Sequence, residues 1–468
     1  MRNVVLLCLD SVRKDTFDAY ARRLDRRIEL SYEQCRAASS WSAPSYASML
    51  TGDLAHDHGV CTHDKRVSSI DPSETFLARE AFEGHEAIGV STNAFAGSAF
   101  GFDRFFDRFA DVTESNRYPD ALDPASLTAE SDASGPSAYL EFLREAVRHD
   151  RPLESLANGA VGFLDTVSAD APVPKLFDDG ARAVIKESKR SITTSREPLF
   201  LFTTFMEAHT PLQHIRGFDR SLHSASNGFT TYERSVWELM EATDDHESFL
   251  ETRRELYDAT VDYLDRTITP FLAWLETNTA LETTVVITAD HGENQGYPCE
   301  EGHVRHKSSL SEGLLHVPLA VVNPPDGYPE IEDGYVSHLE LGDLLAAFAR
   351  EEVVDLTRDR VVAEHVGMSA GPEPPERREY WDRLMRAAYE DGRKVVWDSL
   401  GNARAYGLDP ARPCWQRRVE DDASVPPWAE EYFDEDAASA KRRLAEDGES
   451  EDAVDAAVQD RLEKLGYA

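Results

Sequence analysis

Lysine is scarce in this chain, and acidic residues far outnumber basic ones. Asp and Glu total 87 against 49 Lys and Arg, which gives a formal charge of −38 at pH 7, and only about nine of the basic residues are lysine. This charge excludes a general affinity for nucleic acid or anionic lipid, since both would be repelled. The acids are spread along the whole chain, as in proteins adapted to molar salt, where the Debye length is about 3 Å. We therefore expect a halophilic host.

Cysteine and long apolar runs are also in short supply. The apolar run near the N-terminus is too short for a secretory signal, and no later segment approaches the length of a membrane span. We expect a cytoplasmic protein without membrane contact. The cysteines form no C-x-x-C pair, which argues against a disulfide framework or a thiolate zinc site. They are five in number and widely scattered: Cys8, Cys35, Cys61, Cys299 and Cys414.

Three apolar runs end in groups that can carry chemistry. Val4–Leu9 is a continuous run that ends at Asp10, residues 283–293 read TTVVITADHGE, and residues 197–211 run into His209. Continuous runs of this kind are typical of strands buried on both faces of a parallel sheet. A long amphipathic pattern from 251 to 277 lies between two of them. Strands alternating with helices predict an open α/β sheet, with ligands bound beyond the carboxyl ends of its strands.

The composition changes along the chain and suggests its domain organisation. We predict a catalytic α/β domain over residues 1–345, interrupted by an acidic helical insertion at about 110–196 that decorates or covers the core. Residues 346–468 would form a small α+β subdomain, with antiparallel strands near 361–365 and 392–410. It would include an acidic segment at 420–451 and a closing helix at 457–467.

The residue types at the strand ends point to a metal ion. Asp10, Asp290 and His291 supply the carboxylate and imidazole ligands that a hard or borderline divalent cation needs. Ser42 precedes Pro44 at the start of a short predicted helix that stops at Gly52, and the free N–H groups of a helix start stabilise phosphoryl or sulfuryl oxygens. Taken singly, each residue also fits a helix cap or a turn.

The order and spacing of several motifs carry a more specific signal. Over residues 2–325 the chain resembles the sulfatase family of the alkaline phosphatase superfamily. The resemblance implies a three-layer α/β sandwich with a large, mostly parallel sheet and a small C-terminal α+β subdomain. The motifs that carry it are LCLDSVRKD at 7–15, SAPSYASMLTG at 42–52, HGV at 58–60, GFDRFFDRF at 101–109, MEAHTPL at 206–212, YDATVDYLD at 257–265, ITADHGE at 287–293 and HKSSLSEGLLHVPLAVV at 306–322.

The resemblance also implies roles for single residues. Asp10, Asp290 and His291 match the family's metal ligands, and Ser42 stands at the nucleophile position, where it would also contact the metal. Some superfamily members hold a second metal with an acid four residues before the histidine at 209. That position is Phe205, so we expect one divalent ion: calcium, manganese, magnesium or zinc.

The remaining catalytic roles also follow from the resemblance. Lys307 matches the lysine that binds the non-bridging oxygens of the ester, with His306 beside it as a substrate-binding candidate. His209 matches the histidine that contacts the transferred group or protonates the leaving oxygen. The substrate would be a small-molecule or glycan ester of sulfate or phosphate.

Three departures from the family pattern leave the reaction open. The second of two adjacent aspartates is replaced by Ser11, and the C/S-x-P-x-R signature for formylglycine formation ends at Tyr46 instead of arginine. Asn93 stands near the place of a lysine and a histidine and could contact an oxyanion. If residue 42 becomes formylglycine, we expect a metal-dependent sulfatase. An unmodified Ser42 suits a phosphomonoesterase, phosphodiesterase or phosphotransferase, and a noncatalytic anion- or glycan-binding member is the third alternative.

Overall fold

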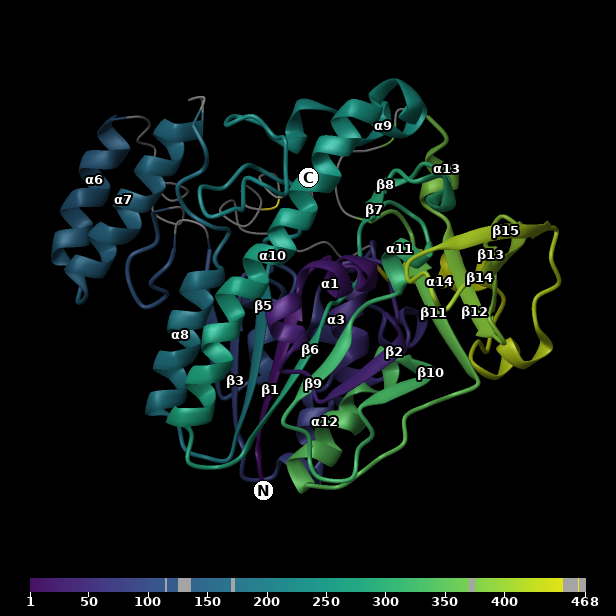
Figure 1. The fold of residues 1–468 in the computed structure, drawn as a ribbon, viewed down its shortest axis with the longest axis horizontal. Coiled ribbons are helices and arrows are strands. Elements are labelled where there is room, and N and C mark those ends of the chain that lie inside the picture. The colour runs from purple at the N-terminus through teal and green to yellow at the C-terminus, as the bar shows by residue number, and fades with distance from the viewer. Residues whose placement is uncertain are drawn as a thin grey trace.

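The computed structural model describes residues 1–113, 116–124, 136–169, 173–369, 374, 376–448 and 462. Within these residues an eight-stranded sheet forms the centre of the molecule (Figure 1). From one edge to the other its strands are β10 (Ile331–Ser337), β2 (Leu30–Arg36), β9 (Leu319–Val322), β6 (Thr283–Thr288), β1 (Asn3–Leu9), β5 (Leu199–Phe205), β3 (Glu86–Ser91) and β4 (Arg108–Asp111).

The sheet is mostly parallel, as the sequence predicts. Only β9 runs against its neighbours β2 and β6, whereas the other paired strands are parallel. Every residue of β1, β5 and β6 is buried, because helices cover both faces of the central strands. The three predicted apolar runs are therefore confirmed as adjacent strands in the order β6, β1, β5.

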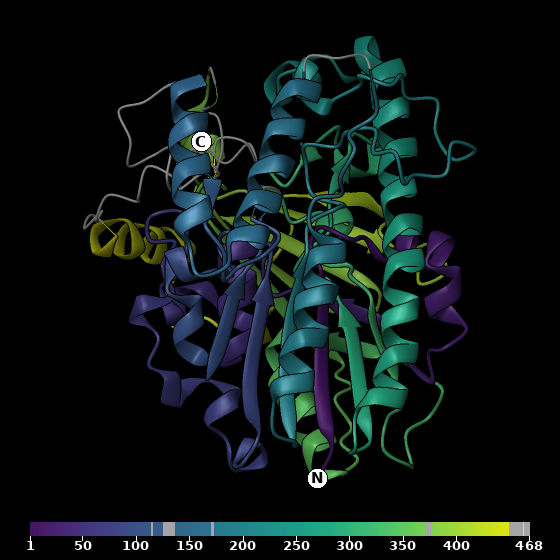
Figure 2. The ribbon, with the colours of Figure 1, turned by 90° about the vertical axis from the view of Figure 1, so that its left-hand side faces the viewer.

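Two helical layers enclose the sheet. On one face α8 (Ala181–Thr194) and α10 (Glu247–Asn278) pack side by side, with α1 (Lys14–Tyr20) and α2 (Arg22–Asp25) against α10. Figure 2 shows α8 and α10 standing in front of the strands. The other face carries α3 (Ser42–Thr51) and α12 (Leu341–Arg350), which contact each other. The expected three-layer sandwich is confirmed.

The segment at 110–196 does not lie wholly outside this sandwich. The helices α6 (Pro136–Arg148) and α7 (Pro152–Ala169) pair with each other and project from one side (Figure 1). In contrast, α8 packs directly on β3 and β5 and belongs to the helical layer. The expectation that the whole segment decorates the core is therefore wrong for α8.

A second, antiparallel sheet forms the small C-terminal subdomain. Its strands follow one another in space as in sequence: β11 (Arg360–Val366), β12 (Leu384–Glu390), β13 (Arg393–Asp398), β14 (Ala403–Leu408) and β15 (Gln416–Asp421). The subdomain also contains α13 (Arg378–Trp381) and α14 (Ala437–Asp447). The predicted closing helix at 457–467 lies almost entirely outside the described residues.

Short elements connect these layers. They are α4 (Ala55–His58), α9 (Val236–Glu241), α11 (Glu312–Leu315) and a two-stranded ribbon of β7 (Asn294–Gln295) and β8 (Val304–Arg305). In the described part of the chain, no helix is both long and apolar enough to cross a bilayer.

Candidate active site

The carboxyl ends of β1 and β6 bring two acids and a histidine together. Asp10 directly follows β1, while Asp290 and His291 follow β6, and all three side chains are fully buried. Their ligand atoms all lie within 4.8 Å of one another. These residues lie together because β1 and β6 are parallel neighbours, so both strands end at the same edge of the sheet, as the sequence predicts.

This cluster has the properties of a cation site. Burial and the charge of Asp290 raise the pKa of Asp10 to about 6. One oxygen of Asp290, Oδ2, accepts no hydrogen bond from the described residues, although His291 Nε2 lies 3.5 Å away. The other ring nitrogen of His291, Nδ1, is 2.7 Å from the Gly292 carbonyl and donates to it, which leaves Nε2 facing the acids. Two buried carboxylates and an imidazole therefore fit a divalent cation.

Ser42 lies directly against this cluster. It is the first residue of α3, is fully buried, and places its Oγ 3.3 Å from both Asp10 Oδ2 and His291 Nε2. Asn93 donates from Nδ2 to the same Oγ at 3.2 Å. No side chain caps the start of α3. Pro44 has no N–H and Ser45 donates its N–H to the Trp41 carbonyl at 3.3 Å, so the candidates for binding an oxyanion here are the N–H groups of Ser42 and Ala43.

Tyr46 and Ser11, two of the three departures from the family pattern, both contact the acids. Tyr46 donates from its hydroxyl to Asp10 Oδ2 at 3.4 Å and packs edge-on against Phe202. Ser11 donates from Oγ to Asp10 Oδ1 at 2.8 Å and from its N–H to Asp290 Oδ1 at 3.2 Å. Both residues thus help to orient the carboxylates.

A second group of buried polar side chains adjoins the cluster. The ring of His306 lies 5.0 Å from that of His291 and 5.3 Å from that of His209, measured between centroids. Burial lowers the pKa of His209 and of His306 to about 3, so both rings are neutral at pH 7. The structure therefore brings both predicted histidines to the predicted metal ligands.

Lys307 follows His306 and is also buried. Its Nζ donates to the Ser369 carbonyl at 3.4 Å, and burial together with the charge of Arg305 lowers its pKa well below the usual range. A cavity of about 440 Å³ begins beyond this lysine, lined by Ser308 and Ser309 and by the second sheet. The predicted metal ligands do not line it.

The sequence did not reveal the role of Glu293, two residues after His291. Its buried carboxylate accepts from Arg253, from Thr210 and from His306. Burial alone would raise the pKa of Glu293, but the hydrogen bond from His306 and the charge of Arg253 lower it far below its usual range. Glu293 belongs to the ITADHGE motif and Thr210 follows His209, whereas Arg253 lies on α10 without any sequence signal.

A family model described as Sulfatase matches residues 2–349. The chain belongs to the sulfatase family. No curated protein matches it.

Several solved structures of other proteins have a similar fold. The phosphonate monoester hydrolase of Agrobacterium radiobacter is 15% identical, with 96% of each chain covered and a TM-score of 0.59. BT1596, a 2-O GAG sulfatase, is 13% identical over 95% of this chain and 91% of its own, with a TM-score of 0.56. A protein of the alkaline phosphatase superfamily from Vibrio parahaemolyticus is 12% identical over 96% and 89%, with a TM-score of 0.51.

Proposed function

We propose that this chain is a metal-dependent hydrolase of sulfate esters in which the side chain of residue 42 is the nucleophile. One observation carries the proposal: Ser42 Oγ lies 3.3 Å from both Asp10 Oδ2 and His291 Nε2 at the uncapped start of a helix. A nucleophile, a cation site and an oxyanion site thus meet at one point.

Asp10, Asp290, His291 and Ser42 would hold the divalent ion. The unpartnered Asp290 Oδ2 and the raised pKa of Asp10 both favour a cation among these side chains. When bound, a divalent ion supplies Lewis-acid charge that favours the alkoxide form of a coordinated hydroxyl. Calcium, magnesium, manganese and zinc all accept ligands of this kind.

The residues of the chain divide the remaining work. For a sulfate ester, one hydroxyl of the hydrated formylglycine at residue 42 would give its proton to a neighbouring acceptor. Its oxygen would bond to sulfur while the bond from sulfur to the leaving oxygen breaks and that oxygen takes up a proton. The second hydroxyl would then lose its proton, which re-forms the aldehyde and releases sulfate. Asn93 donates to the Ser42 oxygen and keeps it oriented. His209 contacts the leaving oxygen, and the N–H groups of α3 with Lys307 bind the oxygens of the transferred group.

The substrate of this reaction would be an anionic ester of a small molecule or a glycan. Because the chain carries a charge of −38, such an ester is drawn in only by local positive charge. Arg305, whose charge acts on both His209 and His306, supplies that charge, and a bound anion would favour the protonated form of the buried Lys307. The glycan sulfatase among the structural neighbours is in keeping with this class of substrate.

A specific observation favours a second candidate, an unmodified serine that acts on phosphate esters. Tyr46 occupies the place of the arginine in the formylglycine signature and is built into the site through Asp10 and Phe202. If Ser42 remains a serine, its covalent ester must be hydrolysed or transferred. This chemistry suits a phosphomonoesterase, phosphodiesterase or phosphotransferase.

The mass of the Ser42 peptide, taken from protein of the native source, separates the two candidates. Loss of two hydrogens means formylglycine, and sulfate esters are then the expected substrates. An unmodified serine moves phosphate mono- and diesters to the front. In either case we expect Ser42→Ala to reduce turnover at least about a thousandfold.

The matched control for Ser42→Ala lies in the same helix. Ser45 is equally buried, but its Oγ donates to the Ser39 carbonyl, so Ser45→Ala should leave turnover within about threefold of the wild type. Full turnover by Ser42→Ala would exclude the nucleophile. A metal-loaded preparation in molar salt that turns over neither ester class would favour the noncatalytic, anion-binding alternative.

A further inference from the structure

We propose that Glu293 is a positioning residue that fixes the ring of His306 in one tautomer and ties the turn of His209 to the turn of the metal ligands. The inference rests on the proposed function, because it concerns how that site presents its imidazoles to an ester. It assigns a task to a carboxylate that neither binds the cation cluster nor contacts Ser42 in the geometry described above.

Both oxygens of Glu293 are occupied by neighbours from different elements. Oε1 accepts from Arg253 Nη2 at 2.6 Å and from Thr210 Oγ1 at 2.9 Å, while Oε2 lies 3.1 Å from His306 Nδ1. The side chain has no exposed surface. A carboxylate held on both sides in this way has a single orientation, so it can orient its partners in turn.

The contact with His306 determines which ring nitrogen carries the proton. A carboxylate paired with Arg253 can only accept, so the hydrogen of the neutral ring must lie on Nδ1. Nε2 is then the acceptor nitrogen. The His306 ring lies 5.3 Å from the His209 ring and 5.0 Å from the His291 ring, so its tautomer is set in contact with both of these predicted site residues.

Through Thr210, Glu293 also holds the turn that carries His209, the second predicted catalytic histidine. Thr210 directly follows His209 at the turn after β5. Its hydroxyl donates to Glu293, which lies two residues after His291. Arg253 binds the same turn from α10, because its Nη1 also donates to the Asn294 carbonyl at 3.2 Å. One carboxylate therefore joins the ends of β5 and β6, α10 and the segment of His306.

The substitution Glu293→Gln tests this arrangement with little change in shape. The amide oxygen can still accept from Arg253 and Thr210, but the amide nitrogen must then donate to His306 Nδ1. The ring is forced to carry its proton on Nε2. An analogous carboxylate-to-amide change beside a catalytic histidine lowers turnover about ten-thousandfold through the wrong tautomer.

Two readouts follow on the full chain in molar KCl. Long-range ¹H–¹⁵N spectra of histidine-labelled protein should show the Nδ1–H tautomer of His306 in the wild type and the Nε2–H tautomer in Glu293→Gln. With an ester that the wild type hydrolyses, kcat of Glu293→Gln should be at least about a hundredfold lower, whereas KM should change less than about threefold. A wild-type Nε2–H tautomer, or an unchanged tautomer in the variant, overturns the proposal.

The chain offers a matched control for the loss of a buried acid. Glu364 of β11 is equally buried and accepts from Arg386 of β12 at 2.8 Å and from His56 Nδ1 of α4 at 2.9 Å. Glu364→Gln should leave the His306 tautomer unchanged and kcat within about threefold. A kcat loss in Glu293→Gln no larger than in Glu364→Gln would mean that Glu293 has only a structural role.

A second variant covers the case in which Glu293→Gln does not fold. Thr210→Val removes one donor to Glu293 and should lower kcat about tenfold with the His306 tautomer retained. Failure of the proposed function remains distinguishable, because the tautomer is read without substrate. A tautomer that switches in a chain without any ester turnover supports the positioning role and contradicts the hydrolase. Equal ester turnover by wild type and Glu293→Gln supports the hydrolase and contradicts the positioning role.

Discussion

At the scale of single residues, Ser11 departs from the family pattern but still contacts the predicted metal ligands. A serine is a poorer metal ligand than the second aspartate that the family often has. Here its hydroxyl donates to Asp10 and its N–H donates to Asp290. The backbone of Ser11 has a positive φ of 62°. The residue orients both acids without being needed as a ligand itself.

We therefore expect Ser11→Ala to weaken the affinity for a divalent ion about tenfold to a hundredfold, the usual cost of losing an outer hydrogen bond to a ligand. Isothermal titration of the metal-free chain measures the change. Ser48→Ala is the control, because Ser48 is equally buried but its Oγ is bonded to His58. Equal affinities in wild type and Ser11→Ala would mean that the other donors to Asp10, Tyr46 and Asn93, orient it without Ser11.

The sequence was sufficient to predict which chemical groups meet. Asp10, Asp290 and His291 stand at the ends of continuous apolar runs, and neighbouring parallel strands end at the same edge of a sheet. It was not sufficient for the groups that orient them. Arg253 meets Glu293 across 40 positions of the chain, and such a contact depends on where α10 packs rather than on any local pattern.

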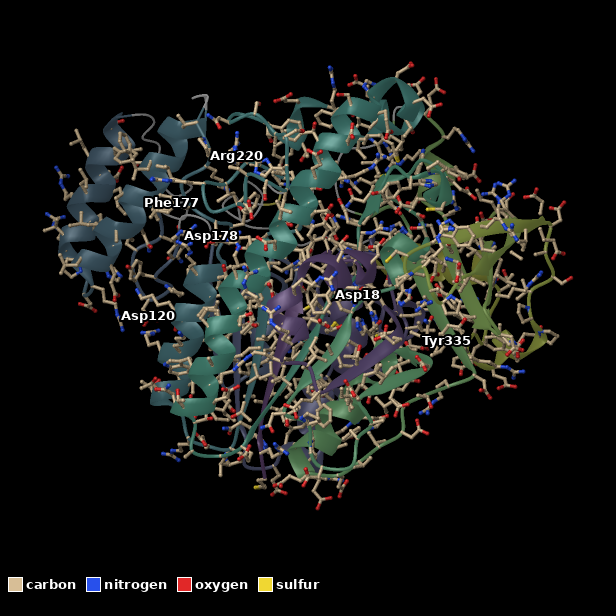
Figure 3. All side chains as sticks on the ribbon, viewed as in Figure 1. Asp18, Asp120, Phe177, Asp178, Arg220 and Tyr335 are labelled. Carbon is tan, nitrogen blue, oxygen red and sulfur yellow. The ribbon has the colours of Figure 1, made fainter. Side chains whose placement is uncertain are left out.

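At the scale of elements, the two sheets are joined by a buried ionic network. Glu312 of α11 binds Arg36 of β2 at 3.0 Å and Lys394 of β13 at 2.9 Å, and all three are buried. The Arg36 guanidinium also lies 5.5 Å from the ring centre of Tyr335, which Figure 3 labels at the junction of the sheets. One carboxylate thus balances a cation from each sheet.

Glu312→Gln should reduce the free energy of unfolding at pH 7 by about 3–5 kcal/mol, because it leaves two buried cations without their counter-ion. Although burial opposes it, the charges of Arg36 and Lys394 lower the pKa of Glu312 to about 2. A lowered pKa stabilises the fold above the unfolded value of about 4.3 and loses that effect as the pH falls toward 2.

The difference between wild type and Glu312→Gln should therefore be constant above about pH 5 and shrink below it. Urea unfolding at constant KCl between pH 3 and pH 8 measures it. A difference that keeps its full size down to pH 3 would show that the loss comes from packing and not from charge.

The helices were predicted less well than the strands, and α8 explains why. Its apolar residues share one face with Glu187, Ser188 and Ser191, so the sequence predicts an amphipathic helix but not which surface that face covers. The continuous runs of β1, β5 and β6 have no such ambiguity. Tertiary packing, which a local pattern does not contain, decides that α8 covers the sheet.

At the scale of the whole molecule, the charge of −38 sets the conditions under which the fold is stable. Acids at the surface repel one another over a Debye length of about 10 Å at 0.1 M salt but only about 3 Å at 1 M. The buried pairs, such as Glu312 with Lys394, are screened much less. Added salt should therefore remove repulsion while leaving the internal pairs largely intact.

We expect the melting temperature to rise by at least about 5 °C between 0.1 and 2 M KCl, measured by calorimetry on the metal-free chain. Sucrose at equal osmolality is the control, because it favours compact states without screening charge. An equal rise in sucrose would assign the effect to solvent exclusion. A melting temperature that falls in KCl would contradict the halophilic reading, because attractive surface pairs and not repulsion among the acids would then dominate the electrostatic energy of the fold.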